Sequence, residues 1–276
     1  MNYRSLSIFL FCLALLCAGC FAPMAGNSNK PPTQEVVVFA AASLTEVFTQ
    51  IGAAFTANDP QANLTFNFAG SQQLASQLAE GAPASIFASA DQHQMKAVVD
   101  SGRVEPASVA LFACNRLVVV ANRERITSLA DLAQPGMKLV IGAESVPVGV
   151  YTLAFLAASA TDPAYGEPFR QDVLGNVVSY EQSVRAVLSK VRLGEADAGI
   201  VYATDAQVAS ATTTDVAVLE IPTHLNQLAH YQVASLRDGS APEMARQFID
   251  FLLSSEGKDL LTAAGFSIDC TVAATP

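Results

Sequence analysis

Hydrophobic residues follow two different periods along the chain, and the first change of period comes at Ser43. Residues 36–42 form a continuous apolar run, as in a strand that is buried on both faces. The apolar residues after it recur at helical spacing: Leu44, Val47, Phe48, Ile51 and Phe55. The pattern predicts a strand, a tight turn of small residues, and a helix that begins at or near Ser43.

Ser43 has two interpretations at this position. A helix N-terminus has unpaired N–H groups and a positive dipole end, which favour an anion, and a serine hydroxyl adds one more donor. Alternatively, Ser43 and Glu46 form a capping box that satisfies the first N–H groups, and no ligand binds. The recurrence of the same arrangement further along the chain favours the binding site.

Three later helix starts repeat this arrangement, each after a predicted strand: Gly70-Ser71 after 64–69, Pro147-Val148 after 137–142, and Ser183-Val184 after 177–178. Further strands are predicted at 84–90, 116–122, 198–202, 216–221 and 231–236. Alternating strands and helices predict an α/β fold with mainly parallel sheets flanked by helices. In such sheets ligands bind beyond the carboxyl ends of the strands, and all four turns lie at that end.

A single long helix is predicted near the C-terminus. It begins at residues 240–243, Ser-Ala-Pro-Glu, which have the pattern of a capping box with proline near the first helical position. Its expected buried face consists of Met244, Phe248, Phe251 and Leu252.

The first 20 residues have the pattern of an export signal. One positive charge precedes a short apolar segment at 6–16, and small residues precede Cys20. This ending resembles a bacterial lipoprotein processing site, at which Cys20 would be lipidated and become the new N-terminus. An ordinary signal or an uncleaved anchor is the alternative. Residues 21–34, rich in Pro, Asn, Ser and Gly, predict a flexible tether.

Processing at Cys20 would leave two cysteines, Cys114 and Cys270, in the body of the chain. An even pair in an oxidising compartment favours a disulfide. Two separate buried thiols are the alternative, and the sequence leaves both open.

Composition narrows the classes of ligand. A net charge of −10 argues against nucleic acid, and an anion site in such a chain must rely on local dipoles. The sequence has no dinucleotide-binding, P-loop, zinc-protease or serine-hydrolase motif, and its three histidines are not at metal-ligand spacing. Hydroxyls and free N–H groups suit a small, fully dehydrated dianion, so the sequence predicts a binding protein without a cofactor and not an enzyme.

Six segments, in this order, resemble the substrate-binding proteins of bacterial molybdate ABC importers: 37–44, 70–71, 80–84, 89–91, 146–151 and 194–202. The resemblance runs from about Glu35 to Phe266. It implies a two-lobed type II periplasmic-binding-protein clamshell. Lobe I would comprise residues 35–113 plus 224–276, and lobe II residues 114–223.

The resemblance also implies a ligand set and partners. The oxyanion, molybdate or tungstate, would be bound by Ser43, Ser71, Val148, Val184 and Tyr202, with Val148 standing where the family commonly has alanine. The protein would be an exported monomer that touches the membrane only through its lipid anchor, and it would deliver the ion to a membrane permease. Molybdenum would be present in the site only as part of the bound molybdate ion, held by these same residues.

Three other functions remain as alternatives. A receptor for another tetrahedral oxyanion, such as sulfate, would use the same neutral donors. A secreted serine hydrolase would need Ser43 or Ser71 as its nucleophile, but neither has a recognisable base partner. The ligand-sensing half of a transcription regulator can share the fold, but the signal and the missing DNA-binding helices argue against it.

Overall fold

The computed structural model describes residues 34–212 and 216–271 of the 276-residue chain. The predicted signal peptide, Cys20 and the tether as far as residue 33 lie outside the described residues. Residues 34–271 belong to a single compact unit that contains two five-stranded sheets. No helix in the described part of the chain is both long and apolar enough to span a membrane.

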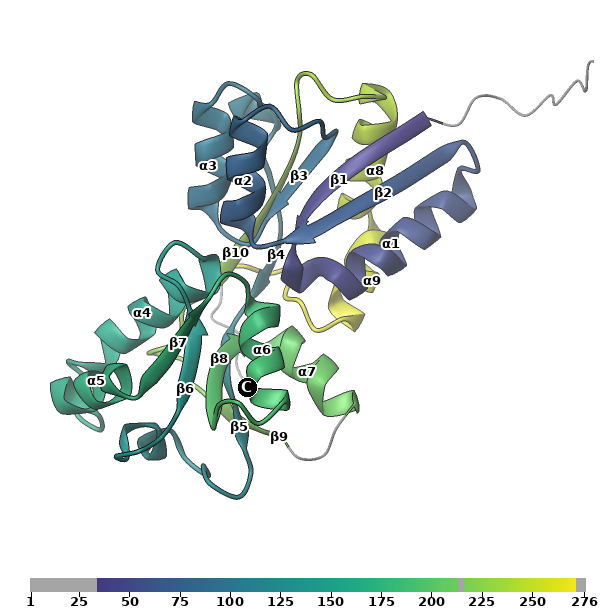
Figure 1. Ribbon diagram of the computed structural model, residues 1–276. Helices are drawn as coiled ribbons and strands as arrows, with labels where there is room; N and C mark the ends of the chain where they lie inside the picture. Colours follow the sequence, from purple (N-terminus) through teal and green to yellow (C-terminus); the bar gives the residue numbers. More distant parts are fainter. Residues whose placement is uncertain (1–33, 213–215, 272–276) are drawn as a thin grey trace, which may run out of the picture. The chain divides into compact units, whose positions relative to one another are not determined.

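The first sheet has the strand order β2-β1-β3-β10-β4 (Figure 1). Its strands are β1 (Gln34–Ala41), β2 (Ala62–Ala69), β3 (Ile86–Ser89), β4 (Ala110–Asn115) and β10 (Ala229–Ser235). Its helices are α1 (Thr45–Asn58), α2 (Ser71–Ala79), α3 (Gln92–Asp100), α8 (Pro242–Leu253) and α9 (Ser255–Ala263).

Both faces of this sheet are covered, which explains the continuous apolar run of β1. Val36 and Val38 pack in the same core as Phe48 of α1 and Phe248 of α8. Phe39 lies in a second core with residues of α2 and α3, such as Leu74 and Met95. In a strand that is buried on both faces, successive residues are apolar and do not alternate with polar ones.

The second sheet has the order β7-β6-β8-β5-β9. Its strands are β5 (Leu117–Asn122), β6 (Leu139–Gly142), β7 (Val177–Glu181), β8 (Ala198–Tyr202) and β9 (Val216–Glu220). Its helices are α4 (Pro147–Ser159), α5 (Gly166–Gly175), α6 (Val184–Arg192) and α7 (Ala203–Thr212). Short 3₁₀ turns complete the described elements: η1 (Ala42–Leu44), η2 (Pro106–Ser108) and η3 (Leu129–Ala133).

Each sheet is mainly parallel, as the sequence predicted, and contains one reversed strand that makes it mixed. β10 pairs antiparallel with β3 and β4, and β5 pairs antiparallel with β8 and β9, while the other pairings are parallel. The reversed strands are β5, the first strand that the chain forms in the second sheet, and β10, the first strand that it forms on its return to the first sheet. Such a strand has no helical crossover, which is the connection that a parallel pair requires. The predicted two-lobed α/β architecture is confirmed by the structure.

The chain passes from the first sheet to the second between Asn115 and Leu117, and returns between Glu220 and Ala229. The side chain of Asn226 joins the two crossings. Its oxygen accepts from the Leu117 N–H at 3.0 Å, and its nitrogen donates to the Leu117 carbonyl at 2.8 Å. The precise lobe boundaries at 113/114 and 223/224 stay predictions.

The predicted single C-terminal helix is wrong, because the chain forms α8 and α9 in its place. Ser254 ends α8 and caps α9, with its hydroxyl accepting from the Gly257 N–H at 3.3 Å. The predicted capping box at Ser240 is also absent. Ala241 is the N-cap, with a φ of 48°, and Ser240 donates to the Glu35 carbonyl at 3.0 Å.

Cys114 and Cys270 form a disulfide in the structure, with their Cα atoms 5.6 Å apart. Two backbone hydrogen bonds between Cys114 and Ser267, of 2.7 and 2.9 Å, align the same segments. The C-terminal segment is thereby attached to β4 of the first sheet.

Candidate functional site

The five residues predicted to bind the oxyanion line one small pocket. The first sheet contributes Ser43 and Ser71, and the second contributes Val148, Val184 and Tyr202. The cavity volume is about 20 Å³, slightly more than the roughly 10–15 Å³ that one water molecule needs. The remaining lining residues are all uncharged: Ala41, Ala42, Gly70, Ala90, Val146, Pro147 and Ser183. The pocket therefore fits a small ligand and offers no cation to it.

Ser43 lies in η1, a 3₁₀ turn between β1 and α1. The capping box of Ser43 with Glu46, which was the alternative interpretation, is absent, since no side chain caps either η1 or α1. The Ser43 hydroxyl instead hydrogen-bonds the Tyr231 hydroxyl at 2.9 Å, and Glu46 forms an ion pair with Arg185. Both side chains are thus used in tertiary contacts, and the turn at the end of β1 leaves the serine in the pocket wall.

Ser71 is the first residue of α2, where the N–H groups have no acceptor within the helix. Its hydroxyl accepts from the Ala90 N–H at 3.1 Å, so its own proton remains available. Gly70 precedes it because a Cβ there would lie 2.3 Å from the Gln182 carbonyl oxygen. This close approach brings the start of α2 against the segment that precedes α6.

The start of α4 depends on a proline and a glycine. Pro147 occupies the first helical position, where its missing N–H costs nothing. A Cβ on Gly149 would lie 1.9 Å from the Ala143 carbonyl oxygen, so only glycine allows this helix start. The Val148 side chain is buried between them, and its first-turn N–H is the group it can offer a ligand.

Ser183 and Val184 have separate tasks at the start of α6. The Ser183 hydroxyl accepts from the Ala186 N–H at 3.2 Å and caps the helix. Val184 is the first helical residue, and its N–H belongs to the unpaired first turn. Val184 can therefore offer a ligand its backbone N–H, while the Ser183 hydroxyl beside it, which also lines the pocket, accepts the capping bond.

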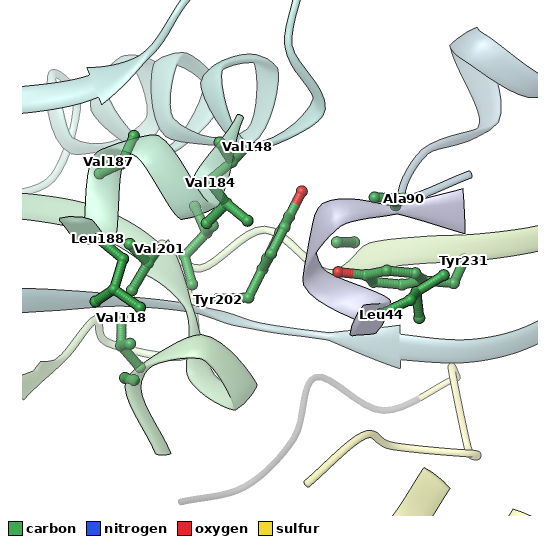
Figure 2. Packing of buried hydrophobic residues seen from close by; sticks show 14 of the residues in the cluster. Leu44, Ala90, Val118, Val148, Val184, Val187, Leu188, Val201, Tyr202 and Tyr231 are labelled. Atoms are coloured by element: carbon green, nitrogen blue, oxygen red, sulfur yellow. The ribbon is translucent and has the colours of Figure 1, made fainter. Parts of the chain in front are cut away.

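Tyr202 ends β8 and is 1% exposed, yet its hydroxyl has no hydrogen-bond partner among the described residues. Figure 2 shows the ring between Val184 on one side and Ala90 and Tyr231 on the other. Burial raises the pKa of this phenol well above its ordinary value of 10.0, so the group keeps its proton. A buried donor without an acceptor is rare in proteins and is explained where a ligand supplies the acceptor.

Of the contacts that join the two sheets, we refer to three as the closure contacts, because their residues are at or next to the helix starts around the pocket. The Gln72 side chain donates to the Gln182 carbonyl at 2.8 Å. The Gln94 side chain donates to the Ser145 carbonyl at 3.3 Å. The third contact is the ion pair of Glu46 with Arg185. They hold the helix starts from both sheets around the same cavity.

The described residues contain no group of three or more histidines, cysteines and carboxylates that could hold a metal ion. His93 is exposed at the start of α3, as the sequence predicted, and His224 pairs with Asp162 at 2.8 Å. Sequence reasoning missed Tyr231 as a neighbour of the site. Its place in a predicted strand gives no signal of a contact with a serine 188 positions away.

The sequence matches the bacterial extracellular solute-binding proteins over residues 36–267. The chain belongs to this family. Among relatives of this solute-binding protein, the molybdate-binding protein ModA of Mycobacterium tuberculosis is 39% identical over 268 residues, covering 92% of this chain and 95% of that protein.

Two solved structures share the fold of this solute-binding protein. The periplasmic molybdate-binding protein of Azotobacter vinelandii superposes with a TM-score of 0.73 at 19% identity, over 84% of this chain and 98% of that one. The sulfate-binding protein SubI of Mycobacterium tuberculosis superposes with a TM-score of 0.75 at 19% identity, over 87% of this chain and 89% of that one. At these identities the likeness shows the two-lobed fold alone.

Proposed function

We propose that this solute-binding protein captures molybdate or tungstate outside the cytoplasm and delivers it to the membrane permease of an ABC importer. One observation carries the proposal: donors from both sheets converge on one uncharged pocket, in which the Tyr202 hydroxyl has no hydrogen-bond partner among the residues that the structure describes. The 39% identical relative from Mycobacterium tuberculosis, a molybdate-binding protein by name, supports this choice of ion. The protein would act as a receptor, without a catalytic step or a cofactor.

Neutral donors can hold a dianion because the residues that carry them are buried and fixed in place. A hydrogen bond to a charged group contributes about 1.5–3 kcal/mol, and several such bonds together offset the cost of dehydration. The hydroxyls of Ser43, Ser71 and Tyr202 and the first-turn N–H groups of Val148 and Val184 are the proposed set. The positive dipole ends of α2, α4 and α6 add to the field at the ion.

Binding would be coupled to closure of the two lobes, 35–113 plus 224–276 and 114–223, about the two crossings between the sheets. The protein would work as a monomer attached to the membrane by lipid on Cys20, with residues 21–34 as the tether. Calorimetric titration of Cys20→Ala and wild-type protein should give the same affinity, because every residue that lines the pocket lies between Ala41 and Tyr202 in the sequence.

Calorimetric titration of the purified protein with molybdate, tungstate, sulfate and phosphate tests the function. We expect one-to-one binding of the first two, weakened about 10- to 100-fold in Ser43→Ala, Ser71→Ala and Tyr202→Phe, which each remove one bond to the charged ligand. Ser108→Ala, on the exposed η2 turn, is the matched control and should leave binding unchanged. Binding of sulfate alone would show that the site binds an oxyanion but that the proposed ion is wrong. No binding of any oxyanion would refute the proposal.

A further inference from the structure

Three charged side chains, Glu46, Arg185 and Asp205, form a cluster beside the oxyanion pocket, and we refer to them as the charged trio. Each follows a proposed ligand residue by no more than three positions in the sequence. A neighbouring cavity of about 240 Å³ is lined by Glu46 and Arg185 and shares Ser43 with the pocket. The net charge of the trio is therefore close enough to affect an anion in the pocket.

Arg185 is shared between two carboxylates from different sheets. Its Nε lies 2.9 Å from an oxygen of Asp205, on the same sheet, and its guanidinium also pairs with Glu46, on the other sheet. Opening of the lobes would separate Glu46 from Arg185 and leave Arg185 with Asp205. Closure around a ligand therefore brings a second carboxylate to one cation, and the trio has an excess negative charge if both carboxylates are ionised.

This excess charge opposes the binding of an anion. Asp205 is 0% exposed, and the Arg185 charge is the main group that offsets its own. A dianion in the pocket adds to the repulsion, because a nearby like charge disfavours the ionised form of a carboxyl. A proton on Asp205 removes the excess charge and leaves the pair of Glu46 with Arg185 intact.

We propose that capture of the oxyanion is coupled to the uptake of one proton by Asp205, so that binding strengthens as the pH falls. This inference rests on the proposed function and adds a regulation of the same site. The proton comes from the solvent or its buffer and forms an O–H bond on the Asp205 carboxylate, and no other bond changes.

Asp205 takes up the proton in preference to the other titratable groups that face it. The Glu46 side chain is 41% exposed, so water stabilises its charge. Tyr202 of β8 and Tyr231 of β10 also interact with Asp205, but burial raises the pKa of both phenols well above 10.0. Both tyrosines therefore stay neutral with or without a ligand.

Two further sets of charges lie near the trio. Arg116 and Glu220, which line a cavity with residues of α7, pair with each other. Asp91 is the other buried carboxyl near Tyr202, and it caps α3 by accepting from the Gln94 N–H at 2.7 Å. Burial raises the pKa of Asp91, and this bond opposes the rise. Asp91 is thus the rival proton acceptor.

The sign of the pH dependence follows from the charges around Asp205. Burial raises its pKa to about 7, and the Glu46 carboxylate adds to the rise, which the Arg185 charge opposes. The pKa should therefore be lower with the lobes open and higher with a dianion bound. Affinity falls as the pH rises from the lower value to the higher one, by at most about tenfold per pH unit for one proton.

Calorimetric titration with molybdate, in buffers that differ in their heat of ionisation, measures the protons taken up per ligand. Near pH 7 the wild-type protein should take up part of a proton, up to one, whereas Asp205→Asn should take up none. Asp205→Asn should also lose the fall of affinity with rising pH. Asp172→Asn, at an exposed position of α5, is the matched control and should keep the wild-type uptake.

Glu46→Gln provides a second variant, in which the uptake should be smaller because closure brings no second charge to Arg185. Unchanged uptake in Glu46→Gln, or uptake that persists in Asp205→Asn and is lost in Asp91→Asn, would overturn the role of Asp205. Wild-type protein that binds molybdate without taking up a proton would overturn the inference and leave the proposed function in place. Wild-type protein that binds no oxyanion would overturn both.

Discussion

Asp205, in α7, is a buried carboxyl three positions after the pocket residue Tyr202. It is 0% exposed, and its oxygen lies 2.9 Å from the Arg185 Nε in an ion pair. Burial raises its pKa from 3.8 to about 7, although the Arg185 charge opposes the rise. Asp205 is thus a group whose charge changes within the physiological range.

Stability should depend on pH through Asp205. Between the unfolded pKa of about 4 and the folded value of about 7, the folded state binds the extra proton, so the free energy of unfolding falls as pH rises. Denaturant unfolding at pH 5 and pH 8 should show a smaller loss of stability in Asp205→Asn than in the wild type. Asp172→Asn, at an exposed position of α5, is the control and should keep the wild-type difference. Equal differences in Asp205→Asn and wild type would contradict the prediction.

At the scale of elements, the site depends on where four helices begin. Each start lies at the carboxyl end of a strand, so the local signals for ending the strand and beginning the helix also place a donor. The start of α4 is the most constrained, because its backbone approaches the Ala143 carbonyl more closely than any side chain would allow.

Gly149→Ala should displace the start of α4. The added Cβ would meet the Ala143 oxygen at 1.9 Å, and such overpacking typically costs about 1–3 kcal/mol. Thermal melting should show the loss of stability, and titration with molybdate should show weaker binding, since the Val148 N–H moves with the helix. Gly175→Ala, at the end of α5, adds a Cβ with no heavy atom within 4 Å and should be tolerated. A fully stable Gly149→Ala protein with wild-type affinity would refute this account of the helix start.

At the scale of the whole described unit, Arg185 connects the two sheets. It pairs with the buried Asp205 on its own sheet and with Glu46 on the other. Because the Arg185 side chain is 25% exposed and that of Glu46 41%, solvent weakens the second pair. This pair is the one closure contact that involves two charges, so salt should affect closure through it.

Glu46→Gln should weaken ligand binding modestly, by up to about fivefold, because an exposed ion pair contributes about 0.2–1 kcal/mol. Molybdate titrations at low and high salt provide the measurement: the difference between variant and wild type should shrink at high salt. Asp100→Asn, which breaks the exposed pair of Asp100 with Lys96 in α3, is the matched control and should not change affinity. A difference that persists at high salt would show that Glu46 acts by another route than charge.

The sequence by itself determined the recurrent strand, turn and helix start, and the resemblance to known binding proteins implied five ligand residues, all of which line the pocket. These signals are local: an apolar run, small residues, and a change of period lie within about a dozen positions. Elements without such signals were missed, namely β4, α5 and α7. β4 joins its sheet only through β10, which comes more than a hundred positions later.

Tertiary structure alone decided how the side chains at these turns are used. Ser43 and Glu46 have the local pattern of a capping box, yet Ser43 hydrogen-bonds Tyr231 and Glu46 pairs with Arg185, 188 and 139 positions away. Ser240 likewise has the local pattern of a helix cap, yet its hydroxyl donates to the Glu35 carbonyl, 205 positions away. Helix starts are encoded locally because they depend on backbone groups within one turn, whereas a polar side chain bonds whichever partner the folded chain brings to it.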